Sequence, residues 1–179
     1  AAKAYDVLTT DKSGLGMLLQ YTSPVHQRIT PSVELRHDAI CLPQKPVLGF
    51  IGAGNYASRM LIPAFKSAGA QLHTIVTAGG INGVIHGEPA GFSVASTDLD
   101  AMLADSTMNA VAIVTRHDTH AAFIAKALRA GKHVFVEKPM AIDTAGLHLV
   151  QAAYEDVHNS ATAIGPQLMV GFNRRFSPQ

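Results

Sequence analysis

Residues 47–57 read Val47-Leu48-Gly49-Phe50-Ile51-Gly52-Ala53-Gly54-Asn55-Tyr56-Ala57, an apolar run that ends in a glycine-rich turn. The run predicts a buried parallel strand, and the pattern after the turn predicts a helix. Gly52 and Gly54 allow the main chain to approach a ligand closely, while Ala57 supplies a small side chain that fits against the sheet. Free amides at the start of the following helix attract phosphate groups. The segment therefore predicts a site for the pyrophosphate of a dinucleotide.

The rest of the chain alternates between apolar runs and helical patterns, as a doubly wound α/β fold requires. We expect a mainly parallel sheet of about six strands, at residues 47–51, 72–77, 92–95, 110–114, 134–136 and 168–171. Helices are predicted between Gly54 and Gly69 with a kink at Pro63, at Asp98–Leu103, and between Thr119 and Gly131. The glycines and proline within residues 79–89 indicate an irregular crossover there.

One further helix is expected after Asp143, whose side chain can cap it. Its buried stripe is predicted to comprise Leu147, Val150, Tyr154 and Val157. Ile142 precedes the cap, where it can pack on Leu147 as a hydrophobic staple.

Ligands of doubly wound folds bind beyond the carboxyl ends of the strands, so the loops at those ends are candidate site segments. These loops are Gly52–Tyr56, Thr77–Gly80, Thr115–His120, Glu137–Met140 and Phe172–Arg175.

Three segments together resemble the Gfo/Idh/MocA family of oxidoreductases. They are the glycine turn, Ala130-Gly131-Lys132-His133-Val134-Phe135-Val136-Glu137-Lys138-Pro139, and Val170-Gly171-Phe172-Asn173-Arg174-Arg175-Phe176-Ser177-Pro178. The resemblance implies a Rossmann-type domain that binds NAD or NADP, followed in the family by a substrate domain that is absent from this chain. It also implies hydride transfer between the nicotinamide and a sugar, a cyclitol or a sugar derivative.

By this resemblance, Glu137, Lys138 and Pro139 match the family's Glu-Lys-Pro motif, whose lysine lies beside the reacting carbon. Lys138 is therefore the catalytic candidate, because an ammonium group can stabilise negative charge on a substrate oxygen or relay a proton. The alternative is a solvated lysine at a strand end. The family's aspartate and histidine belong to the substrate domain, so we expect this chain to bind cofactor without useful turnover.

Thr115 and His120 match the family's Thr-Pro-Asn segment and its later histidine, whereas Arg116 and His117 replace the proline and the asparagine. The expected cofactor contacts are Gly52, Gly54, Asn55, Tyr56, Ala57, Thr77, Thr115, Arg116, His117, His120, Glu137, Lys138 and Pro139. His117 and His120 also invite a zinc interpretation, but no cysteine or carboxylate cluster accompanies them, so no metal is expected.

The choice between NAD and NADP usually depends on the residue that ends the second strand. Thr77 stands there, followed by Ala78, Gly79 and Gly80. The segment offers neither a carboxylate for the ribose hydroxyls of NAD nor a cation for the phosphate of NADP. Both cofactors stay open, and a preference for NADP rests only on the missing carboxylate.

Residues 1–46 do not continue the pattern and are predicted to be a tail or linker, which leaves 47–179 as the cofactor domain. Ala4–Leu8 can form a helix and Gly16–Tyr21 a strand. Ala4–Leu8 and Gly14–Tyr21 resemble the closing helix and strand of zinc-type medium-chain alcohol dehydrogenases, which implies that a unit of that class precedes the domain. The alternative is an expression tail or a connector punctuated by prolines.

The composition of the 179 residues, with 47% hydrophobic residues and a formal net charge of +1, is typical of a globular cytoplasmic domain. No charge run suggests nucleic acid, and no apolar stretch reaches the ~20 residues of a membrane span. The single cysteine forms no internal disulfide, and the oligomeric state stays open, a homo-oligomer included. The alternative functions are a non-catalytic dinucleotide-binding or sensing module, which would not need Lys138, and an assembly module.

Overall fold

The computed structural model describes residues 30–37, 41–42, 44–159 and 165–177, together with the single residues 7, 10, 20 and 22. The helix predicted over Ala4–Leu8 and the strand predicted over Gly16–Tyr21 lie outside these residues, apart from Val7 and Gln20. The chain divides into two compact units, Ala1–Thr30 and Pro31–Gln179. The second unit contains the whole α/β pattern.

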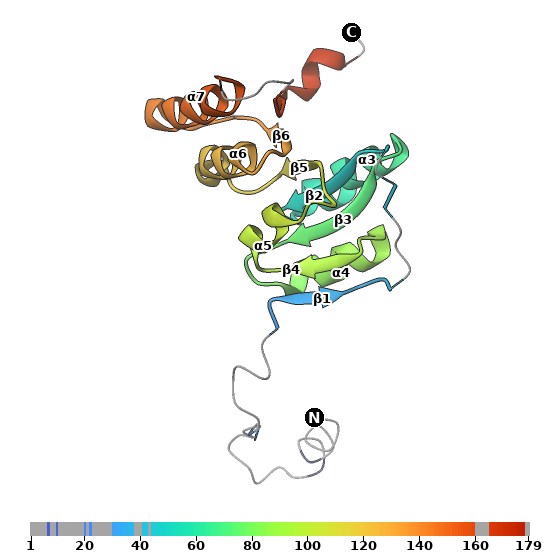
Figure 1. Cartoon of the computed structure of the whole chain (residues 1–179). Coiled ribbons are helices and arrows are strands. Elements are labelled where there is room, and N and C mark those ends of the chain that lie inside the picture. Colours follow the sequence, from blue (N-terminus) through green and yellow to red (C-terminus); the bar gives the residue numbers. More distant parts are fainter. Residues whose placement is uncertain are drawn as a thin grey trace. The chain divides into compact units, whose positions relative to one another are not determined.

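A seven-stranded sheet forms the middle of the second unit (Figure 1). The strands are β1 (Ser32–Glu34), β2 (Val47–Ile51), β3 (Gln71–Val76), β4 (Val94–Ser96), β5 (Ala110–Ile113), β6 (His133–Glu137) and β7 (Leu168–Gly171). Their order in the sheet is β1-β4-β3-β2-β5-β6-β7, with β1 antiparallel to β4 and every other pair parallel. Because the winding reverses at β2, the crevice of the fold lies beside its carboxyl end. The predicted Rossmann-type fold is confirmed.

The sequence pattern predicts six strands and misses β1, which lies in the segment interpreted as a connector. Ser32 and Glu34 pair with Ser96 and Val94, and the hydroxyl groups of Ser32 and Ser96 lie 2.8 Å apart. All three residues of β1 are exposed. A short edge strand of this kind has no buried face, so its side chains carry no alternating apolar signal.

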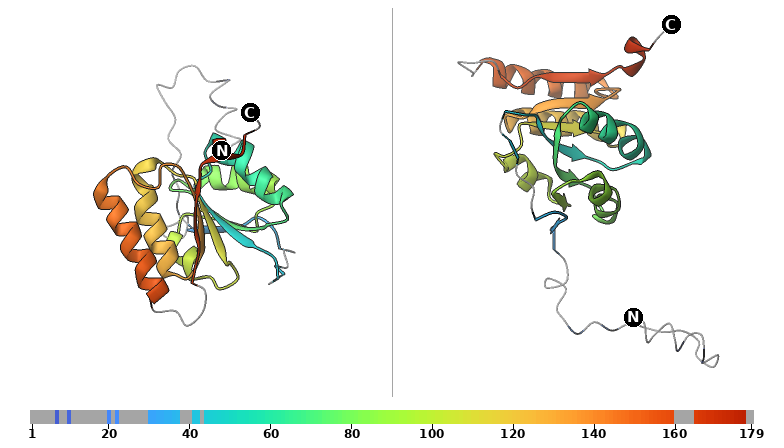
Figure 2. Two further views of the ribbon diagram at one scale, coloured as in Figure 1. Left: turned by 90° about the horizontal axis from the view of Figure 1, so that it is seen from above. Right: turned by 90° about the vertical axis from the view of Figure 1, so that its right-hand side faces the viewer.

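Helices cover both faces of the sheet (Figure 2). On one face lie α3 (Ile62–Ser67) and α4 (Ile81–Ala90), and on the other lie α5 (Leu99–Ala104), α6 (His120–Arg129) and α7 (Thr144–Asn159). Each face buries its own apolar cluster. The cluster under α3 and α4 centres on Phe50, whose ring meets Phe65 and Phe92 edge to face at 5.8 and 5.6 Å. Such aromatic pairs add to the stabilisation that burial alone provides.

The helix after the glycine turn changes type just before Pro63. A π-helical segment, η1 (Ala57–Leu61), leads directly into α3, and Pro63 stands in the first turn of α3. Proline has no amide hydrogen to donate, so the ladder of hydrogen bonds must change where it enters a helix. The predicted kink therefore takes the form of a π segment followed by a short α-helix, which ends before Gly69 at a φ of +88°.

The irregular crossover predicted for residues 79–89 is wrong, because Ile81–Ala90 forms the α-helix α4. Its buried residues are Gly83 and Gly87, whereas Ile81 and Ile85 are exposed. A Cβ added to Gly87 would lie 2.9 Å from Cγ2 of Ile75, so the helix packs closer to the sheet than a side chain would allow. Tertiary packing of this glycine face overrides the low helix propensity of glycine.

Two aspartates cap helices, and the cap predicted for Asp143 is confirmed. The carboxylate of Asp98 accepts the Ala101 amide at 2.9 Å and begins α5, and Asp143 accepts the Gly146 amide at 2.7 Å beside α7. Ile124, Ala127 and Leu128 of α6 are buried.

The stripe predicted for α7 is only partly right. Leu147 is 46% exposed and Ile142 is 61% exposed, so the predicted staple between them is not buried. Val150 and Ala153 are the buried residues of this helix. The buried face is therefore narrower than the periodicity suggests, because α7 is the outer helix that packs mainly on α6.

Among the described helices, none combines the length and the apolar composition that crossing a bilayer requires. The cytoplasmic location expected from the sequence stays a prediction.

A buried lysine organises the amino-terminal edge of the sheet, opposite the crevice. Lys132 is only 6% exposed, and its ammonium donates to the carbonyl oxygens of Asp105 at 2.7 Å and Met108 at 2.8 Å. Hydrogen bonds of this kind stabilise a charge that would otherwise be costly to bury. They fix the turn that leads into β5.

The Asp105 carboxylate belongs to the same cluster. Partial burial disfavours its ionisation, but hydrogen bonds from Thr107 and the charges of His73 and Lys132 outweigh this effect and lower its pKa. Burial, together with the nearby Asp105 charge, raises the pKa of the Cys41 thiol. The charged cluster therefore favours an ionised Asp105 and a neutral Cys41.

The glycine face of α4 generates the first prediction. We expect Gly87→Ala to lower the free energy of unfolding by about 1–2 kcal/mol, because overpacking Ile75 outweighs the better helix propensity of alanine. Ile85→Ala, on the exposed face of the same helix, should change it by less than about 0.5 kcal/mol. Urea denaturation at 25 °C measures both variants. A Gly87→Ala variant as stable as the parent would contradict the close packing.

The second prediction concerns acid stability. Because folding lowers the pKa of Asp105, its ionised form stabilises the protein above the unfolded value of 3.8, and this contribution disappears as the pH falls through the lower folded value. We expect the stability difference between the parent and Asp105→Asn to be largest near neutral pH and to shrink below about pH 4. Denaturation curves across pH test this, with exposed Asp100→Asn as the control. A difference that stays constant down to about pH 2 would exclude the charge effect.

Candidate functional site

The glycine turn after β2 brings two strand ends into contact. Gly52 has a φ of +103°, and a Cβ added to it would lie 2.7 Å from the carbonyl oxygen of Val114, which follows β5. The Gly52 amide also donates to the carbonyl of Val76 at 2.8 Å. Gly54 differs, because a Cβ there would meet no atom within 4 Å. Gly52 is thus required by the protein's own packing, while Gly54 faces open space.

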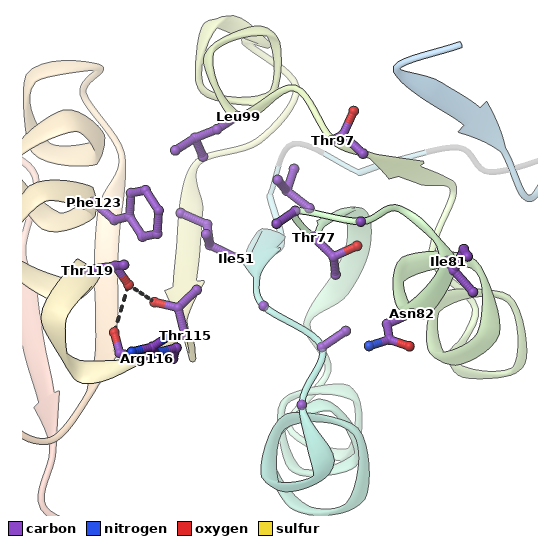
Figure 3. Close-up of a pocket in the computed structure, with 16 residues that line it drawn as sticks. Ile51, Thr77, Ile81, Asn82, Thr97, Leu99, Thr115, Arg116, Thr119 and Phe123 are labelled. Carbon is purple, nitrogen blue, oxygen red and sulfur yellow. Dashed lines mark hydrogen bonds between the residues drawn. The ribbon is translucent and has the colours of Figure 1, made fainter. Parts of the chain in front are cut away.

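A cavity of about 780 Å³ lies beside this turn (Figure 3). Its walls come from the carboxyl ends of β2, β3 and β5 and from the first turns of α4, α5 and α6. The side chains that face it from these elements are Ile51, Val76, Thr77, Ile81, Asn82, Thr97, Leu99, Thr115, Thr119 and Phe123. Most of this lining is apolar or neutral, as in a pocket for a flat aromatic group with a few polar anchors.

A second cavity of about 290 Å³ lies on the other side of the turn. Its lining contains most of the ionisable candidates, namely His117, Glu137 and Lys138, together with Tyr56 and Asn173. The amide group of Asn173 donates to the Tyr56 hydroxyl at 3.2 Å and joins β7 to the helix after the turn. Gly54 and Thr115 line both cavities. One extended ligand could therefore occupy both and cross the glycine turn between them.

The loop after β5 is held by its own hydroxyl groups. The Thr119 hydroxyl donates to the carbonyl oxygen of Arg116 at 2.7 Å and lies 2.6 Å from the Thr115 hydroxyl, as Figure 3 shows. Because Thr119 uses its only hydrogen on Arg116, Thr115 is the donor in the second bond. The Arg116 side chain extends into solvent and lies 3.6 Å from Asp118.

Glu137 carries an unpartnered oxygen at the second cavity. Among the described residues, no group lies within hydrogen-bonding distance of its buried Oε1. A Cβ on Gly171 would lie 2.9 Å from this oxygen, so the carboxylate fits only because β7 has a glycine there. Buried oxygens are normally satisfied, and one left open beside a cavity fits a hydroxyl-bearing ligand.

The structure brings most of the predicted contacts together. Gly52, Gly54, Thr77, Thr115 and Arg116 line the larger cavity, and Tyr56, Ala57, His117, Glu137 and Lys138 line the smaller one. Three predicted residues line neither cavity. Asn55 is exposed beside the turn, His120 is fully buried behind the loop after β5, and Pro139 directs its carbonyl oxygen toward His120.

The predicted contacts leave out several residues of the larger cavity, among them Asn82, Thr97, Leu99 and Phe123. Each begins or enters a helix that follows a predicted strand, and only the assembled sheet brings the four side chains to one crevice. The rule that ligands bind beyond the carboxyl ends of the strands selects the loops there, but not the first helical turns after those loops. Extending that rule by one turn would have found them.

Within the described part of the chain, no group of three or more His, Cys, Asp or Glu residues has the geometry to hold a metal ion. The rings of His117 and His120 meet edge to face with centroids 5.5 Å apart.

The sheet order, the glycine turn at the winding reversal and the two joined cavities define a Rossmann-type nucleotide-binding domain. The family model described as "Oxidoreductase family, NAD-binding Rossmann fold" (GFO_IDH_MocA) matches residues 47–164, and the chain belongs to this family. Family membership confirms the expected class of cofactor, NAD or NADP. The preceding medium-chain dehydrogenase-like unit stays a prediction.

Curated relatives match over short segments. An inositol 2-dehydrogenase of Rhizobium meliloti (strain 1021) is 42% identical over 80 residues, which cover 45% of this chain and 22% of the relative. A scyllo-inositol 2-dehydrogenase (NAD(+)) of Bacillus subtilis (strain 168) is 42% identical over 83 residues, which cover 46% of this chain and 22% of the relative.

Solved structures extend the match to the fold. KijD10, a 3-ketoreductase from Actinomadura kijaniata in complex with NADP and TDP-benzene, superposes with a TM-score of 0.66 at 26% identity. A putative myo-inositol dehydrogenase from Sinorhizobium meliloti 1021 superposes with a TM-score of 0.65 at 31% identity. The matches cover 76% and 75% of this chain but only 41% and 38% of those chains. The chain thus spans about two fifths of these structures.

Proposed function

We propose that residues 47–179 are the cofactor domain of an oxidoreductase that transfers a hydride between NAD or NADP and a sugar, a cyclitol or a sugar derivative. The position of Gly54 carries the proposal. It lies at the junction of the two cavities, has no neighbour that a Cβ would meet, and follows a glycine that packing alone requires. A pyrophosphate at this junction would contact main-chain amides without obstruction.

The two cavities suit the two halves of a dinucleotide. The larger, mostly apolar cavity between Leu99 and Phe123 fits the adenosine half. The smaller cavity is lined by Glu137, whose buried Oε1 is unpaired among the described residues, and by Lys138, and it fits the polar nicotinamide ribose. The nicotinamide ring, when bound, supplies the hydride chemistry. Protein residues bind it, orient it and exclude water.

Lys138 is the proposed catalytic residue. It is exposed at the smaller cavity, where its ammonium can approach a substrate oxygen and stabilise the charge that develops there. We propose that a substrate domain follows in the full protein and that the present chain alone binds cofactor without useful turnover. The partial coverage of the relatives supports this.

The lining near Thr77 leaves the choice between NAD and NADP to experiment. Among the residues that the structure describes, no carboxylate lines the larger cavity, and Arg116 is the one charged residue there. KijD10 was crystallised with NADP, whereas the Bacillus subtilis relative is named for NAD. A preference for NADP would follow from the missing carboxylate.

We also infer that residues 1–46, apart from the strand β1 that joins the sheet, are a tail or linker. The resemblance of Ala4–Leu8 and Gly14–Tyr21 to the end of a medium-chain dehydrogenase suggests that they follow a unit of that class. The reading frame upstream of Ala1 tests this. A non-catalytic sensing module is the alternative function, and it predicts cofactor binding that never leads to turnover in the longer protein.

Dinucleotide binding tests the proposal directly. We expect NADH, NADPH and their oxidised forms to raise the melting temperature in a concentration-dependent manner, with one phosphorylation state favoured. Gly54→Val should abolish this rise while changing the unliganded melting temperature little, because its side chain enters open space. Glu88→Val, at an exposed position of α4, is the surface control. A parent protein that responds to none of the four ligands would reject cofactor binding.

Catalysis requires the longer protein. In a gene product that includes a substrate domain after Gln179, we expect Lys138→Ala to lower kcat by about 100-fold or more, because charge stabilisation at the substrate oxygen is lost. The Kd for the dinucleotide should change by less than about threefold, since the glycine turn supplies most of the binding. Steady-state kinetics with inositols and keto-sugars measure the change. Unchanged turnover would remove Lys138 from the mechanism.

A further inference from the structure

His120 is a buried polar residue that lies between the two loops of the smaller cavity without lining either cavity. It is the first residue of α6, its exposure is 0%, and its ring stands behind the loop that begins at Thr115. The direct-contact role predicted from the sequence therefore does not explain why a histidine stands there. Its hydrogen bonds point to another role.

Both ring nitrogens of His120 face main-chain carbonyl oxygens. Nδ1 lies 2.7 Å from the carbonyl oxygen of Pro139, and Nε2 lies 3.2 Å from that of Thr115. Carbonyl oxygens can only accept, so each contact is a hydrogen bond only when the facing nitrogen carries a proton. A neutral ring donates to one loop, and a doubly protonated ring donates to both. The shorter distance marks the Pro139 contact as the stronger bond.

These two carbonyl groups belong to the segments that form the walls of the smaller cavity. Thr115 lines both cavities, and Lys138 precedes Pro139 in the chain and lines the smaller one. The two segments follow the paired strands β5 and β6, whose pairing ends at Ile113 and Val136. The ring thus connects them beyond the point where strand pairing stops.

We propose that His120 is a positioning residue for the nicotinamide half of the cofactor. Its bond to Pro139 fixes the segment that carries Glu137 and Lys138 relative to the Thr115 loop, so that the smaller cavity keeps the shape that a bound nicotinamide riboside requires. The inference rests on the proposed cofactor binding. It adds that loss of the His120 ring weakens binding of the nicotinamide half of the cofactor and leaves binding of the adenosine half unchanged.

Two isosteres separate the two bonds. An asparagine side chain places its amide nitrogen near the position of Nδ1, and a glutamine side chain can place its amide nitrogen near that of Nε2. His120→Asn therefore keeps the bond to Pro139, whereas His120→Gln keeps the bond to Thr115. His120→Leu removes both at similar volume.

The experiment compares binding of the whole dinucleotide with binding of ADP, which lacks the nicotinamide half. Isothermal titration measures Kd for ADP, which lacks the nicotinamide riboside, and for whichever of NADH and NADPH the parent chain binds more tightly. We expect His120→Leu to raise the Kd of the dinucleotide about tenfold and that of ADP less than about twofold. His120→Asn should stay within about threefold of the parent for both ligands, and His120→Gln should resemble His120→Leu.

Val150→Ala controls for lost stability, because Val150 is a buried residue of α7 and lines neither cavity. It should leave both dissociation constants unchanged in the folded protein. Equal weakening of ADP and dinucleotide in the His120 variants would overturn the proposal and indicate general loss of packing. A reversed order, with His120→Gln retaining affinity and His120→Asn losing it, would overturn the assignment to the Pro139 bond.

If His120→Leu does not fold, the asparagine and glutamine variants decide between these outcomes. A parent chain that binds ADP but gains nothing from the nicotinamide riboside would overturn the inference alone. A parent chain that binds neither ligand would reject the proposed function itself, and the inference with it.

Discussion

Contact between the ends of β2 and β5 at Gly52 is the constraint on which the crevice depends. With 2.7 Å between the place of a Cβ and the Val114 carbonyl oxygen, only a residue without a side chain lets the two strand ends meet. That contact sets the distance from Gly54 to Thr115, the two residues shared by both cavities. A side chain at position 52 would push the ends of β2 and β5 apart and change the shape of the site.

The amino-terminal and carboxyl-terminal ends of the parallel strands differ in how their polar groups are paired. At the amino-terminal edge, Lys132 donates to two main-chain carbonyl groups, and the ionised Asp105 adds to the same cluster. At the carboxyl-terminal edge, polar groups such as the Oε1 atom of Glu137 stay unsatisfied within the described residues. Lys132 thus satisfies carbonyl groups away from the cavities, whereas the unpaired Glu137 oxygen belongs to a residue that lines the smaller cavity.

Some elements of the fold could be predicted from the sequence and others could not. The central strands and the Asp143 cap could be predicted, because continuous burial and capping depend on local residue types. β1 and α4 could not. The former has no buried face, and the latter depends on how closely Gly87 approaches Ile75, which is a tertiary fact.

In the site, the glycine turn and Glu137–Lys138 follow from motifs, whereas Asn82, Leu99 and Phe123 reach the crevice only through the fold. His120 could be named from its motif, whereas its hydrogen bond to Pro139 depends on how the two loops fold together. Ile81 is 71% exposed and lines the larger cavity, so the protein without a ligand exposes apolar surface to water at the cavity entrance. A purine seated there would cover it, which makes coenzyme a natural solubilising additive during purification and storage.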